Sequence, residues 1–391
     1  AEHGSWDWQP HPVIAIDFNE IGHATPGDLE REIGVHLTRL ARRYHVQLES
    51  PSVVSKFTEL IEALHTATDA SVVVLIDEYD KPLIDHLGKG EPGLAVAKAN
   101  REILRSFFGV LKGTTVSPLL RFVFLTGVSR FSRVSIFSEL NNLYDLSMDD
   151  AYADMLGYTQ EELETRFAPH IAALARHLGW TPEAVKAKLA QHHNGYRFSK
   201  RDVRVYNPFS ILSAFSAGEF GNYWFTSGTP TFLVNLLKQE QYDLSRIEGM
   251  EVDPSVFSTF EIDRLRLEAL LFQTGYVTIS DVHEGVYRLD YPNQEVKTSF
   301  LKSLLYAVGE GIESGASSQV LQLARHLQRE DLGAFFEAMR AIFAAIPYTL
   351  AAQRDEAYFH TIFYLALTAS GVDATSELLT SRGRIDLAVK L

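Results

Sequence analysis

The sequence predicts a multidomain α/β protein whose N-terminal part contains a parallel β-sheet. Three short apolar runs, at 13–18, 71–76 and 119–126, have the character of strands, and helical patterns separate them. Strand–helix–strand alternation of this kind is typical of parallel sheets with helical crossovers. The chain has 391 residues, which predicts two to three domains at roughly 150 residues per domain.

The N-terminal elements follow one another in a regular order. The first strand is β-branched and carries Asp17 close to its end. Apolar residues at helical spacing then predict a helix over 26–44, and similar patterns predict helices over 52–66 and 94–112. The runs at 71–76 and 119–126 are continuous, a pattern typical of strands buried on both faces of a parallel sheet. We therefore expect a doubly wound sheet.

The second half of the chain is mainly helical. Residues 151–250 have helical character, and 261–306 follow the order helix, strand, strand, helix. That order is the layout of a winged helix, although plain helix–hairpin–helix units share it. Helical patterns then continue to about Ser370, and two strand-like pieces follow around Glu377 and Asp386.

Composition excludes several classes of protein. Lys and Arg number 36 against 50 Asp and Glu, a net charge of −14, which disfavours extended, sequence-blind coating of nucleic acid but permits a local basic patch. The absence of cysteine excludes disulfides and cysteine-ligated metals, and it fits a reducing compartment, so we expect a cytoplasmic protein. No apolar run approaches ~18 residues, so we expect neither a membrane span nor an intact signal peptide.

Charge changes sharply in the middle of the chain. Residues 98–133 hold seven Lys and Arg against one acid, whereas 139–165 hold eight Asp and Glu and no Lys or Arg. Two interpretations stay open. The runs are either the solvated faces of helices or the sign of a domain change near residue 145.

The strongest motif is the apolar run 72–76 followed by Asp77 and Glu78, the pattern of a Walker B strand. Such a strand delivers two carboxylates to the edge of the sheet where α/β proteins bind ligands. Asp77 is then a candidate for the magnesium shell and Glu78 for polarising the attacking water. The next strand ends at Thr126, where ATPases place a polar sensor. Arg130 and Arg133 follow, either as phosphate contacts or as partners of local acids.

A nucleotide site also needs a loop that cradles phosphate, with the pattern Gly-x-x-x-x-Gly-Lys-Ser/Thr. This pattern does not occur in the 391 residues. Its absence is the main argument against assigning hydrolysis to this chain alone.

Several short motifs together resemble a bacterial family of AAA-ATPase-like proteins that carry a C-terminal PD-(D/E)XK nuclease-like domain. The motifs are Ile76-Asp77-Glu78-Tyr79-Asp80-Lys81-Pro82-Leu83, Phe124-Leu125-Thr126-Gly127-Val128-Ser129-Arg130-Phe131-Ser132, Asn194-Gly195-Tyr196-Arg197-Phe198, Tyr206-Asn207-Pro208-Phe209, Tyr223-Trp224, Leu271-Phe272-Gln273-Thr274-Gly275-Tyr276 and Gly383-Arg384-Ile385-Asp386. The resemblance covers essentially the whole chain. It implies four regions: an ATPase core over 1–145, a helical lid over 146–255, a winged-helix-like unit over 256–310 and part of a nuclease-like domain over 311–391.

For the ATPase part, the resemblance implies binding of ATP with Mg²⁺. Asp77 and Glu78 take the Walker B roles, Thr126 or Ser129 is the sensor, and Arg130 is a phosphate contact. Gly228-Thr229-Pro230 is similar to a lid motif near adenine, or it is a plain turn at a helix start. The family has a strand, a P-loop and a helix before the segment that begins here at Trp6, so we expect an N-terminal truncation.

For the nuclease-like part, the resemblance implies a strand acid at Asp386 and a helix acid at Glu356, both magnesium ligands; Glu377 is a weaker candidate. Surface acids are the alternative for both glutamates. The Glu-x-Lys strand that completes such a site is missing, since Ala388 stands two residues before Lys390. We expect the intact protein to couple ATP hydrolysis to cleavage of DNA or RNA, and this chain alone to be inactive.

Two other kinds of function stay open. The first is a non-enzymatic regulatory or interaction protein that binds a protein partner on a degenerate ATPase scaffold. The second is a transcriptional regulator acting through the winged helix. His192 and His193 suggest a metal site, but adjacent helical residues point in different directions and an ordinary helix end explains them better. Arg197 is either a phosphate contact or part of a structural turn.

Overall fold

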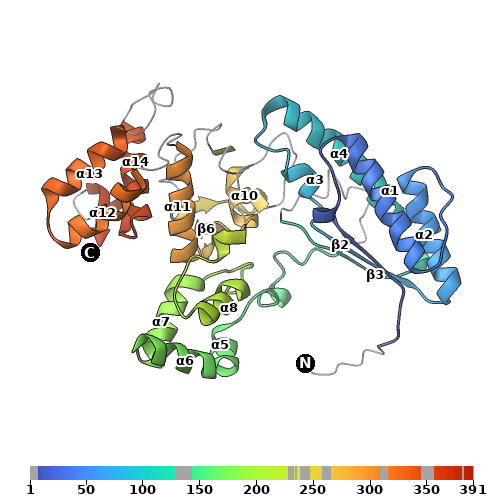
Figure 1. Cartoon of the computed structure of the whole chain (residues 1–391), viewed down its shortest axis with the longest axis horizontal. Helices are drawn as coiled ribbons and strands as arrows, with labels where there is room; N and C mark the ends of the chain where they lie inside the picture. Colours follow the sequence, from blue (N-terminus) through green and yellow to red (C-terminus); the bar gives the residue numbers. More distant parts are fainter. Residues whose placement is uncertain are drawn as a thin grey trace. The chain divides into compact units, whose positions relative to one another are not determined.

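The computed structural model describes two compact units, and each is treated by itself (Figure 1). One unit comprises 1–144 and 255–273, and the other comprises 145–254 and 274–391. The residues that the structure describes are 8–128, 143–227, 233, 236, 237, 247–257, 266–308, 316–344, 356–380 and 383–390. In this part of the chain, no helix combines the length and the apolar character that a membrane crossing requires.

A three-stranded parallel sheet forms the centre of the N-terminal unit. Its strands are β1 (Val13–Asp17), β2 (Val72–Asp77) and β3 (Leu120–Leu125), in the spatial order β1-β2-β3. Both pairs of neighbours run parallel. The mixed α/β class and the parallel sheet predicted from the sequence are therefore confirmed.

Four helices connect these strands: α1 (Pro26–Arg43), α2 (Val53–Thr68), α3 (Lys81–Ile84) and α4 (Gly90–Gly109). Polar side chains cap the N-termini of α1 and α2, the two helices that connect β1 to β2. Thr25 caps α1, with Pro26 in the first turn, and Ser52 caps α2. Each cap satisfies an amide that has no partner inside the helix. The face of α1 with Leu29, Ile33 and Leu37 is buried, as its spacing predicts.

The helices cover one face of the sheet, so the expectation of burial on both faces is wrong for the described residues. Val72, Val74 and Ile76 of β2 are buried, but Leu75 is 37% exposed and Phe122 of β3 is 51% exposed. The reason is topological. Right-handed crossovers that advance steadily from β1 to β3 place every helix on the same side, as Figure 1 shows for α1, α2 and α4. A doubly wound sheet needs a reversal of strand order.

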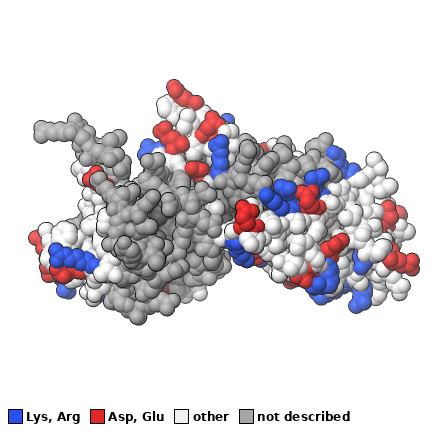
Figure 2. All heavy atoms as spheres, turned by 90° about the horizontal axis from the view of Figure 1, so that it is seen from above, with Lys and Arg blue, Asp and Glu red and all other residues white. Residues whose placement is uncertain are grey.

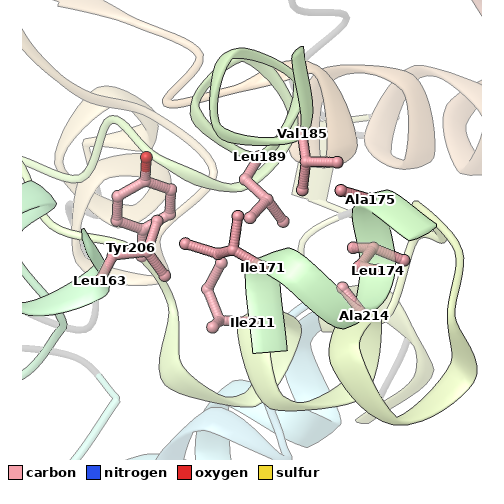
Figure 3. Close-up of a cluster of buried hydrophobic side chains, with 9 residues drawn as sticks. All are labelled: Leu163, Ile171, Leu174, Ala175, Val185, Leu189, Tyr206, Ile211 and Ala214. Atoms are coloured by element: carbon pink, nitrogen blue, oxygen red, sulfur yellow. The ribbon is translucent and has the colours of Figure 1, made fainter. Parts of the chain in front are cut away.

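The other unit begins with a small helical cluster. Its helices are α5 (Gln160–Arg166), α6 (Ala168–Leu178), α7 (Pro182–His193) and α8 (Pro208–Ala217), which confirms the helical character predicted here. Their inner faces meet in one core (Figure 3). The buried members are Leu163, Ile171, Leu174, Ala175, Val185, Leu189, Tyr206, Ile211 and Ala214. Side-chain caps from Thr159, Thr181 and Asn207 begin α5, α7 and α8.

Two antiparallel sheets and further helices complete the described structure. The strands β4 (Met250–Val252), β5 (Thr278–His283) and β6 (Val286–Asp290) form a sheet in the order β4-β6-β5, and β7 (Asp373–Thr380) pairs with β8 (Gly383–Lys390). The helices are α10 (Leu267–Gln273), α11 (Gln294–Val308), α12 (Ala316–Gln328), α13 (Leu332–Ala344) and α14 (Glu356–Ala369). Helix α10 belongs to the first unit, whereas β5, β6 and α11 belong to the second. The winged-helix and nuclease-like assignments stay predictions.

The segment 194–198 has a structural role. The Arg197 side chain is buried and donates to the main-chain carbonyls of Ser199 (3.1 Å) and Lys200, while its own amide donates to Thr278 Oγ1 (2.7 Å). Gly195 has a φ of +112°, and a Cβ at this position would overlap the carbonyl oxygen of Pro292. These contacts favour the structural turn over a phosphate contact by Arg197.

We expect Gly195→Ala to destabilise the protein strongly, because the new methyl group combines left-handed strain with a backbone overlap. Such strain alone costs on the order of 1–3 kcal/mol. The control is Gly179→Ala, where φ is +69° but nothing lies within 4 Å of the added Cβ. The urea midpoint should fall clearly further for Gly195→Ala than for the control; equal shifts would show that the approach of Pro292 does not restrict this position.

Candidate functional site

Two carboxylates stand side by side at the carboxyl edge of the parallel sheet. Asp17 ends β1 and Asp77 ends β2, and the two are direct partners in the strand register. Neighbouring strands lie about 4.8 Å apart, so the two side chains belong to one local site. Asp17 also accepts a hydrogen bond from the amide of Asn19 (2.8 Å), which fixes the start of the following turn.

Thr126, the residue directly after β3, joins this pair. Its hydroxyl donates to Oδ1 of Asp77, and its amide donates to the carbonyl of Ile76 (2.8 Å). The sheet therefore brings together Asp77 and Thr126, two of the residues that the sequence singles out. The Thr126 hydroxyl also fixes the orientation of the Asp77 carboxylate, leaving its other oxygen for a ligand.

Glu78 has an unusual backbone. Its φ is +52°, a conformation that few residues other than glycine adopt. Burial raises the pKa of the Glu78 carboxyl, and the nearby negative charges of Asp80 and Asp77 raise it further. Strained, pKa-shifted carboxyls concentrate at functional sites, although structural networks also produce them.

Asp80 holds the turn after β2 against the turn after β3. Its side chain is fully buried, and Oδ1 accepts from the amide of Val128 (3.1 Å). Gly127 fits here because a Cβ would stand 2.5 Å from Asp80 Oδ1 and 2.7 Å from the Tyr79 ring. The Tyr79 amide donates to the Thr126 carbonyl (3.1 Å). These contacts fix the backbone around Glu78.

Asp17 and Asp77 line a pocket of about 510 Å³, whereas Glu78 and the buried Asp80 are not among its lining residues. Its lining residues are Ala15, Ile16, Asp17, Glu20, His36, Leu40, Arg43, Leu75, Ile76, Asp77, Phe124 and Thr126. The sequence interpretation missed Glu20, His36 and Arg43 as site residues, since they carry no motif. Asp17 had a signal, because an acid that ends a parallel strand lies beside the acid that ends its neighbour.

The donor set suits a magnesium ion that also binds phosphate. Carboxylate oxygens are ligands that Mg²⁺ prefers, and Mg²⁺ usually takes one or two of them together with water and substrate phosphates. Within the described ranges, no group of three or more His, Asp or Glu side chains is placed to hold a metal. Asp17 and Asp77 are the candidate protein ligands.

Several predicted site residues lie outside the described residues. They are Ser129, Arg130, Arg133 and the lid motif Gly228-Thr229-Pro230. Their proposed roles as sensor, phosphate contacts and adenine contact stay predictions.

The candidate nuclease residues lie on α14 and the β7–β8 hairpin. Glu356 is the first residue of α14, and its side chain is not among those described. Asp386 is exposed on β8, and its carbonyl oxygen lies 2.7 Å from Nε2 of His360. Glu377 is on β7. A shared metal site of these acids stays a prediction.

His193, the last residue of α7, is part of a buried network. Nδ1 of His193 lies 2.7 Å from Oε2 of Glu295, and both side chains are almost fully buried. Glu295 Oε1 accepts from the Ser210 hydroxyl (3.2 Å) and from the Trp224 amide (2.6 Å). These contacts favour a structural role for His193, and neither it nor His192 belongs to a group of three or more potential metal ligands among the described residues.

Comparison with known proteins agrees with the first unit's geometry. Residues 1–137 match the family described as "Predicted AAA-ATPase". The chain is 37% identical to "Uncharacterized protein in vnfD 5'region" of Azotobacter chroococcum mcd 1, over 99% of this chain and 73% of that protein. No solved structure matches the chain. The chain belongs to the family of this Azotobacter protein, and its first 137 residues form a predicted AAA-ATPase-like domain.

Proposed function

We propose that this protein binds and hydrolyses ATP with Mg²⁺ at the carboxyl edge of β1, β2 and β3. The observation that carries the proposal is the alignment of Asp17 with Asp77, together with the hydrogen bond from Thr126 to Asp77. Asp77, assisted by Asp17, holds the magnesium ion, which neutralises phosphate charge. Thr126 orients the Asp77 carboxylate and serves as the polar sensor that contacts the phosphate.

Glu78 is the proposed water-activating residue. A general base works best when its pKa lies near the operating pH, and burial together with Asp80 and Asp77 raises the pKa of Glu78 in that direction. The contacts of Asp80 with Val128 and of Tyr79 with Thr126 hold the glutamate's backbone. We assign no phosphate-cradling loop, since the 391 residues contain no Gly-Lys-Ser/Thr.

The test is Mg²⁺-dependent ATP hydrolysis by the full-length protein. Asp77→Asn should raise the Mg²⁺ concentration needed for half-maximal hydrolysis by at least about 10–100-fold. That is the usual loss of metal affinity when a residue that only hydrogen-bonds to a metal ligand is changed. The control is Asp69→Asn, because Asp69 lies before β2, in a left-handed conformation that asparagine tolerates. Equal rates for both variants, or no hydrolysis by the wild type, would favour the non-enzymatic interaction protein.

We further propose that residues 311–391 contribute to Mg²⁺-dependent cleavage of nucleic acid in the full-length protein. The order of elements supports this: Glu356 begins α14, and the hairpin with Asp386 follows. Asp386→Asn should abolish cleavage of plasmid DNA and of RNA while leaving ATP hydrolysis intact. Cleavage that persists unchanged in this variant would refute the assignment.

A further inference from the structure

A second concave surface lies on α1, facing α2. It is a groove of about 620 Å³ within the N-terminal unit. Its lining residues are Gly27, Glu30, Arg31, Gly34, Val35, Thr38, Arg39, Arg42, Pro51, Val53 and Lys56. Four of them are basic and Glu30 is the one acid in this set. We refer to it as the α1–α2 groove.

The basic side chains form a stripe. Arg31, Thr38 and Arg42 are separated by seven and four positions, so they lie on one face of α1, and Arg39 lies beside Thr38. The stripe is about 16 Å long at 1.5 Å per residue. Lys56 approaches it from α2, since its Nζ is 3.8 Å from the place where a Cβ on Gly34 would stand.

Most of this positive charge is not neutralised. Arg31 pairs with Asp28 (2.7 Å) and Glu32 (3.2 Å). The side chains of Arg39, Arg42 and Lys56 make no hydrogen bond or ion pair with any residue that the structure describes, although the charge of Lys56 contributes to lowering the pKa of Glu59 on the same helix. On the face shown in Figure 2, Lys and Arg are mixed with Asp and Glu over the described residues. With four basic residues and one acid in its lining, the groove concentrates cations in a chain of net charge −14.

The lining indicates the chemistry of the ligand. Guanidinium forks and an ammonium group bind phosphate. No aromatic side chain lines the groove, so it offers no platform for stacking bases as sites for single strands do. No Asn or Gln is present to read base edges. Val35, 45% exposed, is the one large apolar side chain exposed there, too little to anchor a partner helix.

We propose that the α1–α2 groove binds the phosphodiester backbone of a nucleic-acid duplex without regard to its sequence. Arg39, Arg42 and Lys56 supply the phosphate contacts. The groove lies outside residues 311–391, so it is a contact separate from the proposed nuclease residues. It is also independent of the carboxylate site, although His36, Leu40 and Arg43 on another face of α1 line that pocket. Helix α1 therefore borders both sites.

The test is equilibrium binding of a fluorescent DNA duplex of about 20 base pairs to the full-length protein across a range of salt concentrations. The test variant combines Arg39→Gln, Arg42→Gln and Lys56→Gln. The control combines Arg166→Gln, Arg176→Gln and Lys200→Gln, three exposed basic residues of the other unit that lie outside residues 311–391, and changes net charge equally.

The test variant should bind the duplex about tenfold more weakly or worse at low salt, and its salt slope should fall by about 3, one for each lost phosphate contact. The control should stay within about twofold of the wild type. Equal loss in both variants, or no loss in either, would overturn the proposal. So would binding of poly-glutamate that depends on these three residues while the duplex does not bind, which would indicate an acidic protein partner.

Discussion

Replacing Glu295 by alanine is expected to lower the free energy of unfolding by about 3 kcal/mol or more, because each of its three buried hydrogen-bond donors costs about 1–3 kcal/mol when it loses its acceptor. Glu295 is 1% exposed and lies in the first turn of α11. Its carboxylate receives hydrogen bonds from His193, Ser210 and the Trp224 amide. Alanine leaves these three donors buried and without their acceptor. Losing a buried hydrogen bond destabilises the fold more than losing one exposed to water, because water cannot replace the missing partner.

The same carboxylate connects separate elements. His193 ends α7, Ser210 lies in the first turn of α8, and Trp224 begins the short helix 224–227. Its removal should therefore loosen several elements together. The matched control is Glu164→Ala, an exposed glutamate 3.9 Å from Lys186, which should cost about 1 kcal/mol or less. Urea denaturation followed by far-UV circular dichroism measures both; a Glu295→Ala loss no larger than the control's would contradict this account.

Local elements of this fold were predictable because their causes are local. The β-branched runs at 13–18 and 71–76 became β1 and β2, and the apolar stripe of α1 became its buried face. The exposure of Leu75 was not predictable in the same way. It depends on strand order, which places the connecting helices on one side, and a continuous apolar run carries no information about that order.

The site shows a similar division. Asp77 and Glu78 were recognisable because the strand and its acids are contiguous. The partnership of Asp77 with Asp17 depends on the register of strands far apart in the sequence. The burial of Asp80 and the lack of space for a side chain at Gly127 depend on the contact between the turn after β2 and the turn after β3. Arg43 and His36 are ordinary polar residues of a helix until α1 is placed beside the sheet edge.

Replacing Glu78 by glutamine is expected to stabilise the protein and to stop ATP hydrolysis. The raised pKa means that the folded state favours the protonated carboxyl, because burial and the charges of Asp80 and Asp77 oppose its ionisation. Stability from this group is present below the pKa of the unfolded chain and is lost as pH rises through the folded pKa. Glutamine imitates the protonated form at every pH.

The urea midpoints of wild type and Glu78→Gln should therefore nearly coincide around pH 4 and separate around pH 8, with the variant more stable. ATP hydrolysis by the full-length variant should fall by about 10²–10⁴-fold, the usual contribution of a positioned general base, while Mg²⁺-ATP still binds. Glu62→Gln, an exposed change on α2, should alter neither property. If the variant is more stable but hydrolyses ATP at the wild-type rate, Glu78 is a strained carboxyl that takes no part in the reaction. A variant that is inactive but equally stable at both pH values would show that ionised Glu78 costs the fold nothing.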